Sequence, residues 1–405
     1  QINPLQRGQM FRSRFFQAYG LWHWGEGLQT VLFTWYMTFY AWLSAAEIGF
    51  YQALVLSPFL LFTVAGGALT DWIGAGRSYA WSTLLFALVL AGYGMMDQAA
   101  GFLPWAFAAY CLLAGITSAV AIPAIDTFIP AASAQSVQAN ALLAATAHNI
   151  AKLAGTLTGL ALPWLLALGG FGLNAILMGL SVALLSLHLR SAAGGVTGAR
   201  QQPQQRPSLR GIWSHYRNCP ENLDILLSSA MLGLLIVPAG YTLWPILLRE
   251  RFPDYGGLLA LLYICAWVGA IGLTALAGRH SARLMRPGSL ALAVWLCWAL
   301  VLALLTLSES FWQMCLIVTL MGGVKLGKAL VYGRYLHNSP AENRGVLIAL
   351  DQTAFWGLAT FGTFLTGLAA ERLGVTLAAL LVSCLVALSV LLLFARKRLS
   401  AIEPA

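Results

Sequence analysis

Apolar residues fill long, uninterrupted stretches of this chain, and short polar segments separate each stretch from the next. A helix that crosses the apolar core of a bilayer needs about 20 such residues. The pattern therefore predicts an all-α polytopic membrane protein with twelve transmembrane helices in two six-helix halves. The predicted spans begin near Phe15, Phe50, Tyr79, Phe102, Ala139, Gly172, Leu223, Gly257, Ser289, Phe311, Val346 and Val375.

The composition excludes a soluble globule. With 59% apolar and 9% charged residues among 405, the chain has too little polar surface to cover one. The net charge of +9 does not indicate a nucleic-acid partner, because the arginines gather at the ends of alternate spans. Five of the six cysteines fall within predicted spans and no CxxC pair occurs, which predicts packing roles. We expect the lipid bilayer as a partner, and neither a cofactor nor a metal site.

The basic residues also predict the orientation in the membrane. Most of them fall on one side of the predicted spans, and only Arg249, Arg251 and Arg372 fall on the other. The positive-inside rule places both termini and the long central connection in the cytoplasm, which requires an even number of spans. We predict a multi-pass protein of the bacterial inner (cytoplasmic) membrane. Because the first residue is Gln1, we expect that the N-terminus is trimmed or processed.

One long polar segment divides the chain near its middle. Residues 191–222 carry the sequences QQPQQ, RPS and NCPEN, which are typical of a linker. We predict an N-terminal six-helix half over 1–190, a cytoplasmic linker over 191–222 and a C-terminal six-helix half over 223–405. A shift of 208 positions lays the TGLA of 158–161 on the TGLA of 366–369. A parallel repeat of this kind is associated with transporters that rock around a central site.

A short connection after the second predicted span carries one acid and one base, in the sequence GGALTDWIGAGR of residues 66–77. This segment resembles the loop signature of the major facilitator superfamily. The positions that match are Gly67, Asp71, Gly74 and Arg77, whereas Trp72, Ala75 and Gly76 depart from the signature. The resemblance implies a gating role for the four matching residues, in which Asp71 pairs with Arg77 and with a helix end of the other half.

Further segments resemble the bacterial permease branch of that superfamily, which holds siderophore and drug exporters. They are IPA at 122–124, FIP at 128–130, QANAL at 138–142 and SPAENRG at 339–345. Two departures concern the mechanism. Cys111 stands where many members have an intramembrane arginine, and the fifth span carries GTLTG at 155–159 in place of the antiporter pattern. The second departure weakens the prediction of antiport and leaves import open.

Three of the four lysines, Lys152, Lys325 and Lys328, fall within predicted spans. An ammonium group there is costly unless it faces a polar cavity, so these lysines predict a path that binds an anionic substrate. For Lys328, snorkelling from a nearby helix end is the alternative. Lys325 and Lys328 are three residues apart, and we predict that they share one face of a span that Gly322 and Gly323 allow to bend.

The first span holds a carboxylate and an imidazole in the sequence WHWGEG at 22–27. Glu26 is the best candidate for a proton carrier, because the protonation of a carboxylate in an apolar environment responds to nearby charges. His23 is predicted to share this coupling role. The alternatives are a structural ion pair between Glu26 and Lys152, and an interfacial position for His23.

Later spans supply three further candidates. His148 lies one turn before Lys152 on the same helix face, so we expect both residues to line the cavity. Trp356, which the repeat places level with His148, is predicted to stack on the substrate. Asp351 is predicted to be a second protonation site or an acid at a helix N-terminus.

Together these features predict a secondary active transporter that works by alternating access. We expect proton-coupled export of an amphipathic, anionic or metal-chelating small molecule such as a siderophore or a drug, with Lys152, Lys325 and Lys328 neutralising its charge. The alternative is an importer of small organic anions or metal–siderophore complexes. The sequence contains no HExxH or GxSxG motif and no clustered His/Asp ligands, so nothing in it predicts an enzyme. It also contains no segment that resembles the soluble output domain of a membrane sensor. We expect protons and a small molecule as partners, and a monomer.

Overall fold

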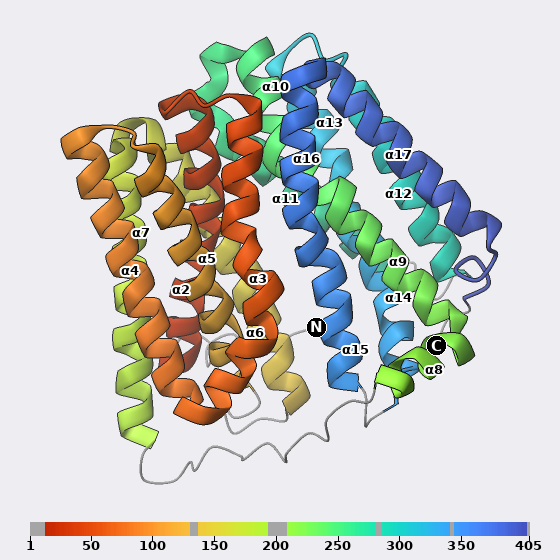
Figure 1. Cartoon of the computed structure of the whole chain (residues 1–405), viewed down its shortest axis with the longest axis horizontal. Coiled ribbons are helices and arrows are strands. Elements are labelled where there is room, and N and C mark those ends of the chain that lie inside the picture. The colour runs from red at the N-terminus through yellow and green to blue at the C-terminus, as the bar shows by residue number, and fades with distance from the viewer. Residues whose placement is uncertain (1–12, 130–136, 193–208, 280–285, 341–343, 403–405) are drawn as a thin grey trace. The chain divides into compact units, whose positions relative to one another are not determined.

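The computed structural model describes residues 13–129, 137–192, 209–279, 286–340 and 344–402 (Figure 1). Within these ranges the chain forms helices joined by short connections and contains no strand. The first half of the chain holds α2 (Arg14–Trp35) with its π-helical end η1 (Tyr36–Tyr40), α3 (Ala45–Ile73), α4 (Ala75–Ala100), α5 (Pro104–Asp126), α6 (Val137–Thr158), the short 3-10 turn η3 (Gly159–Ala161) and α7 (Leu162–Ala192).

After the central segment a short helix, α8 (Leu209–Asn218), precedes the second group of helices. These are α9 (Pro220–Met231) with η4 (Leu232–Ile236), η5 (Ala239–Leu243) and α10 (Trp244–Arg251); η6 (Pro253–Leu258) with α11 (Leu259–Arg279); α12 (Pro287–Leu305); α13 (Phe311–Met321); α14 (Val324–His337); α15 (Arg344–Gln352) with η8 (Thr353–Gly357) and α16 (Leu358–Leu373); and α17 (Val375–Ala395).

The helices reproduce the twelve predicted spans. Among the described residues, nine segments are long and apolar enough to cross a membrane, and one of them, Leu143–Leu189, holds both α6 and α7. The helices α2 and α3 account for the other two spans, and α3 contains the shorter apolar helix Ala45–Leu60. The prediction of a twelve-helix, all-α membrane protein is therefore confirmed. The boundaries 1–190, 191–222 and 223–405 stay a prediction, because residues 193–208 lie outside the described ranges.

The chain groups into two compact units. Unit 1 comprises residues 1–42 and 57–200, and unit 2 comprises residues 43–56 and 201–405. In unit 1, α2 packs against α6 and α7, while α4 packs against α5 and α7. In unit 2, α12 packs against α14 and α17, and α11 packs against α13. The start of α3 groups with unit 2, where Gly49 and Gly367 of α16 approach so closely that a Cβ on either residue would overlap the other.

Two glycines interrupt the helix of the tenth predicted span, where the sequence predicts that it can bend. The helix α13 ends at Met321 and α14 begins at Val324, so the helical hydrogen-bond pattern is interrupted at Gly322 and Gly323. A Cβ on Gly322 would overlap the carbonyl oxygen of Ala266 on α11. The break therefore also lets two helices come into backbone contact.

Candidate functional site

The first candidate cluster depends on a close crossing between α2 and α6 in unit 1. A Cβ on Gly27 would overlap the carbonyl oxygen of Lys152, and a Cβ on Gly155 would overlap that of Trp24. Two helices can touch backbone to backbone only where residues without side chains face each other. These glycines therefore bring α2 and α6 together at the level of Glu26 and Lys152.

We expect Gly155→Ala to destabilise the protein by about 1–3 kcal/mol, because the added methyl group has to push α2 away from α6. The measurement is the apparent melting temperature of the purified protein. Gly172→Ala on α7 is the matched control, since a Cβ there meets nothing within 4 Å. Equal melting temperatures for the two variants would contradict the close crossing.

Glu26 is held from two sides. The Lys152 Nζ lies 2.5 Å from Glu26 Oε1, and the His23 Nδ1 lies 2.8 Å from Glu26 Oε2. About 29% of the Glu26 side chain and 18% of the Lys152 side chain are exposed, so the pair is only partly buried in unit 1. The structural ion pair that was one interpretation of Glu26 is present. Its role as a proton carrier stays a prediction.

Aromatic and imidazole rings enclose the buried side of the same cluster. The His23 ring is 3% exposed, and the rings of Tyr19 and His148 meet it edge-on at centroid distances of 4.4 and 4.1 Å. His23 is thus a buried member of the cluster. The fold thus brings together two histidines and a glutamate that come from two separate helices.

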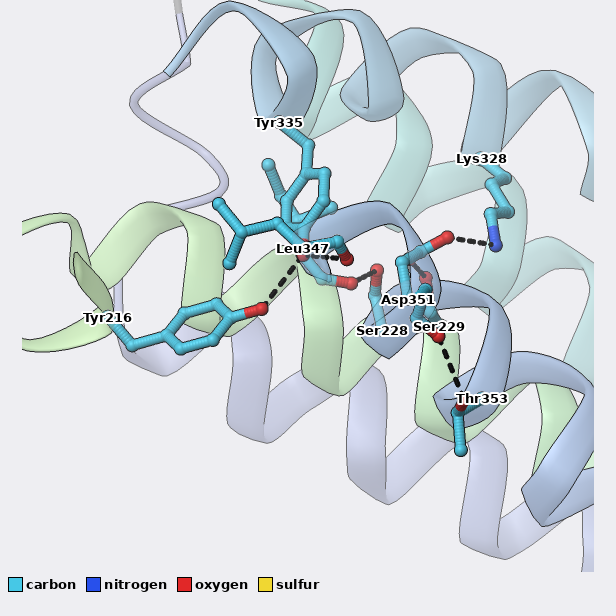
Figure 2. A network of polar contacts seen from close by, with 10 residues as sticks. Tyr216, Ser228, Ser229, Lys328, Tyr335, Leu347, Asp351 and Thr353 are labelled. Carbon is cyan, nitrogen blue, oxygen red and sulfur yellow. Dashed lines mark hydrogen bonds and ion pairs between the residues drawn. The ribbon is translucent and has the colours of Figure 1, made fainter. Parts of the chain in front are cut away.

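A second, separate candidate cluster lies in unit 2 and centres on Asp351, which is fully buried. Figure 2 shows Lys328 of α14 reaching Asp351, with Nζ 3.0 Å from Oδ2. The Ser229 hydroxyl of α9 donates to the other carboxylate oxygen, Oδ1. The Lys328 ammonium also lies 4.3 Å from the centre of the Phe355 ring, a cation–π contact. Three helices therefore meet at one carboxylate.

The place of Asp351 in its helix excludes one of its two predicted roles. It is the eighth residue of α15, and no acid occupies the first turn of that helix. The interpretation as an acid at a helix N-terminus is therefore wrong. The π-helix η8 begins two residues later, at Thr353, and such wide turns are frequent at functional sites.

A buried hydroxyl network supports this cluster (Figure 2). The Tyr335 hydroxyl donates to the Leu347 carbonyl at 2.8 Å, and it contacts the Tyr216 hydroxyl at 2.8 Å. Beside it, the Asn222 amide lies 3.0 Å from the His215 ring nitrogen. These bonds connect α8, α9, α14 and α15, and so fix the helix that carries Asp351.

Lys325 and Trp356 lie in unit 2 in different surroundings. The Lys325 side chain is exposed, and its Nζ lies 3.4 Å from the centre of the Trp267 ring on α11. Lys328 instead turns to α15, so the two lysines, which lie three residues apart on α14, reach different neighbouring helices. The cation–π contact with Trp267 gives the physical reason. Trp356 is half-buried and meets the Phe355 ring edge-on at 4.9 Å.

The predicted gating residues surround the connection between α3 and α4. Gly67 and Asp71 fall in α3, but their side-chain surroundings lie outside the described part of the structure. Gly74 has φ +92°, a conformation that favours glycine, and it separates the two helices. Arg77 is exposed in the first turn of α4. The match to the loop signature thus coincides with a real helix break, and the pairing of Asp71 with Arg77 stays a prediction.

Two buried acids, Asp97 and Asp224, were missed by the sequence reasoning. Asp224 of α9 is fully buried and forms an ion pair with Arg396, which follows the last helix. Asp97 of α4 is 3% exposed and accepts a hydrogen bond from the Tyr36 hydroxyl, which also contacts the Tyr93 hydroxyl at 2.6 Å. An ionisable residue inside a span is a candidate functional residue. The signal was available, because Asp97 is a lone acid in the otherwise uncharged stretch 78–125.

The two clusters share one chemical capability. Each unit holds an acid paired with a lysine inside a membrane-spanning bundle, so the acid masks the positive charge of the lysine. Neutralising the acid would expose an ammonium group that can bind an anion. Binding of an anion by the lysine would in turn release the acid.

Known proteins share this architecture. A family model described as transmembrane secretion effector matches residues 2–405. The solved structure of a peptide transporter, POT, in complex with sulfate is 12% identical, with a TM-score of 0.74 over 97% of this chain and 96% of its own. The nucleoside transporter NupG is also 12% identical, with a TM-score of 0.73 over 95% and 99% of the two chains.

A bacterial homologue of the human lysosomal transporter Spinster, solved in an inward-facing and unoccupied conformation, is 13% identical with a TM-score of 0.60 over the whole of both chains. No curated protein matches the chain. At these identities the solved structures establish a common fold. They do not indicate the substrate of this protein.

Proposed function

The chain belongs to the transmembrane secretion effector family of the major facilitator superfamily, and we propose that it is a proton-coupled exporter of an amphipathic, anionic or metal-chelating small molecule. As a member of this superfamily it is a multi-pass membrane transporter with the twelve-helix fold. The family description supports export, since it names secretion. We place the protein in a bacterial inner membrane, as the siderophore and drug exporters of the resembling branch are.

The observation that carries the proposal is the pairing of an acid with a lysine in the bundle of each unit. Glu26 with Lys152 and Asp351 with Lys328 hold both charges that a proton-coupled transporter of anions needs. The solved neighbours are named for nucleosides and peptides, and one is a complex with sulfate. These names support a small polar solute. The charges of the lysines favour an anionic one.

Competition for the lysine provides the coupling. When a proton neutralises Asp351, its attraction for Lys328 is lost and the ammonium group becomes available to an anionic group of the substrate. When the proton leaves, the carboxylate competes for Lys328 again and expels the substrate. The proton and the anion therefore cross the membrane together, and export proceeds when the outward gradient of the substrate exceeds the inward gradient of protons. Alternating access then exposes the site to each side of the membrane in turn. Glu26 and Lys152 would act in the same way in unit 1, with His23 steadying the carboxylate.

The remaining site residues have supporting roles in this proposal. His148 extends the binding surface beside Lys152, while Trp356 and the Lys325–Trp267 pair offer flat aromatic contacts to an amphipathic substrate. Gly67, Asp71, Gly74 and Arg77 form the gate at the connection between α3 and α4. Proteins of this kind need only the bilayer, protons and a small molecule as partners, and we propose that this one works as a monomer.

A thermal-shift screen of the purified protein tests the substrate class. We expect catecholate or hydroxamate siderophores, or citrate, to raise the melting temperature, because a ligand at about 100 times its Kd stabilises the native state by about 2.7 kcal/mol. Lys152→Ala should abolish this shift. Lys397→Ala is the matched control, since Lys397 is exposed beyond the last helix, and it should keep the shift.

Two outcomes would count against the proposal. Stabilisation by cationic amphipathic dyes alone would favour a drug transporter that does not use the lysines. If a ligand raises the melting temperature of Lys152→Ala as much as that of the wild type, Lys152 has a structural role and does not bind the substrate. For any anionic compound that binds, flux in proteoliposomes under opposite pH gradients then decides between export and the alternative, import of organic anions or metal–siderophore complexes.

A further inference from the structure

The basic segment that follows the last helix is held against unit 2, and we propose that its arginines bind the headgroup of an anionic phospholipid from the surrounding bilayer. Residues 396–402, with the sequence RKRLSAI, carry three positive charges and no acid. They follow α17 and lie beside the start of α12, the helix against which α17 packs (Figure 1). This inference goes beyond the proposed function, and it can be tested without any transported substrate.

Backbone contacts and two buried apolar side chains fix the conformation of this segment. Leu399 is fully buried, and Ile402 is 3% exposed. The Leu399 carbonyl lies so close to Gly288 that a Cβ there would overlap it, and the Ser289 hydroxyl donates to the Ser400 carbonyl at 3.2 Å. Basic residues that serve only to orient a membrane protein need no such fixed conformation. The contacts therefore indicate that these charges are held in defined positions.

A buried acid holds two of the arginines side by side. Asp224 of α9 is fully buried, and its Oδ1 lies 2.8 Å from the Arg396 Nε and 3.8 Å from the Arg398 Nη1. About 41% of each arginine side chain is exposed. A guanidinium group has five N–H donors, so each arginine keeps further donors after it has paired with Asp224. Two guanidinium groups on one carboxylate leave an excess of positive charge that an anion can neutralise.

Arg286 brings a third guanidinium group to the same end of the bundle. It is exposed and stands two residues before Gly288, whose backbone contacts that of Leu399, the neighbour of Arg398. Arginine suits a phosphate group, because its planar fork can donate two parallel hydrogen bonds to two phosphate oxygens. Basic pockets between transmembrane helices on the cytoplasmic side, where these residues are predicted to lie, bind phospholipid headgroups.

The apolar surface that leads to the arginines favours a lipid over a soluble anion. In the last two turns of α17 four large apolar side chains are each more than half exposed, namely Leu388, Leu391, Leu392 and Phe394. An anion bound by the arginines would lie at the end of this surface. A phospholipid has a phosphate at one end and acyl chains behind it, so it matches both features. A free phosphate or carboxylate matches the arginines alone.

The experiment measures lipid binding by the full chain in mild detergent, with native mass spectrometry and thermal shift. The probes are cardiolipin, phosphatidylglycerol, phosphatidylcholine and inorganic phosphate. We expect the two anionic lipids to bind and to raise the melting temperature, because they stabilise the native state, whereas the other two probes should not. Replacing Arg286 and Arg398 together with glutamine should weaken cardiolipin binding by about thirtyfold, since each basic side chain near an anionic surface contributes a factor of about five.

Two comparisons separate a defined site from an effect of net charge. Arg14→Gln combined with Arg217→Gln is the matched control, because both arginines are exposed and predicted to lie on the same side of the membrane, and it should bind cardiolipin as the wild type does. Gly288→Ala keeps every charge but places a methyl group against the Leu399 carbonyl, so it should weaken binding. Gly272→Ala on α11 is its control, since a Cβ there meets nothing within 4 Å.

Melting temperatures without added lipid show whether each variant is folded, and Arg398→Gln alone serves if the double variant is not. Equal loss of cardiolipin binding in the two arginine pairs would overturn the proposal, because the arginines would then act only through net charge. Equal stabilisation by phosphatidylcholine would overturn it too, since only acyl chains would then be recognised. Stabilisation by inorganic phosphate that is lost in the Arg286 and Arg398 variant would assign these arginines to a soluble anion instead.

Discussion

Replacing Lys328 with alanine will lower the free energy of unfolding by about 3–5 kcal/mol, because it leaves a fully buried carboxylate without its cation. The Ser229 hydroxyl still donates to Asp351, but one neutral hydrogen bond does not replace an ion pair in an apolar environment. Unfolding by SDS in mixed micelles measures the change. The effect exceeds that of an ordinary surface pair, because desolvation of the remaining charge adds to the lost attraction.

Two variants separate the charge effect from lost packing. In Lys328→Met with Asp351→Leu both charges are replaced by apolar groups of similar size, and stability should return to the wild-type level or above it. Arg334→Ala breaks the partly exposed pair with Glu221, where 35% and 23% of the two side chains are accessible, and should cost no more than about 1 kcal/mol. Equal losses for Lys328→Ala and Arg334→Ala would contradict a buried pair at Asp351.

The sequence was sufficient to predict the fold, because each span needs only length and apolar character. The break at Gly322 and Gly323 was likewise predictable, since two adjacent glycines weaken a helix locally. The loop match around Gly74 also coincides with a helix break. Such features depend on neighbouring residues, so they can be read along the chain.

An ion pair between two helices was predictable only where the sequence offered two opposite charges that are both costly in a bilayer. An acid and a lysine that are both costly in a bilayer suggested the pair of Glu26 with Lys152, and the structure contains it. The partner of Lys328 could not be assigned in this way, because Lys325 and Lys328 lie three residues apart in the same span and spacing alone does not show which of them meets Asp351. The helix register that buries Asp351 depends on packing against α9 and α14, which no periodicity reveals.

The different neighbours of Lys325 and Lys328 could not be predicted for a related reason. Spacing along a helix fixes where a side chain starts, but a long side chain ends where its neighbours attract it. The Trp267 ring on the adjacent helix α11 draws Lys325 away from the position of Lys328. His23, Glu26 and His148 form a cluster for the opposite reason, since a crossing of glycine residues on α2 and α6 brings distant sequence positions together.

Asp351→Asn will abolish transport driven by a pH gradient and leave exchange of substrate for substrate intact. The amide keeps the shape of the carboxylate and still accepts the hydrogen bond from Ser229, but it can neither bind a proton nor attract Lys328. Lys328 then stays available to the anionic substrate at all times, so the proton no longer decides when the substrate leaves. Proteoliposomes loaded with a compound from the thermal-shift screen provide the measurement, with gradient-driven accumulation and counterflow compared side by side.

The controls identify which acid carries the proton. Asp254→Asn alters an exposed acid in η6 and should transport like the wild type. If Glu26→Gln abolishes gradient-driven accumulation while Asp351→Asn does not, the coupling proton binds in unit 1, as the sequence alone predicted. If both variants accumulate substrate as the wild type does, neither pair couples transport to protons. Loss of counterflow as well as accumulation in Asp351→Asn would instead assign Asp351 to substrate binding, because exchange needs a working binding site but no proton.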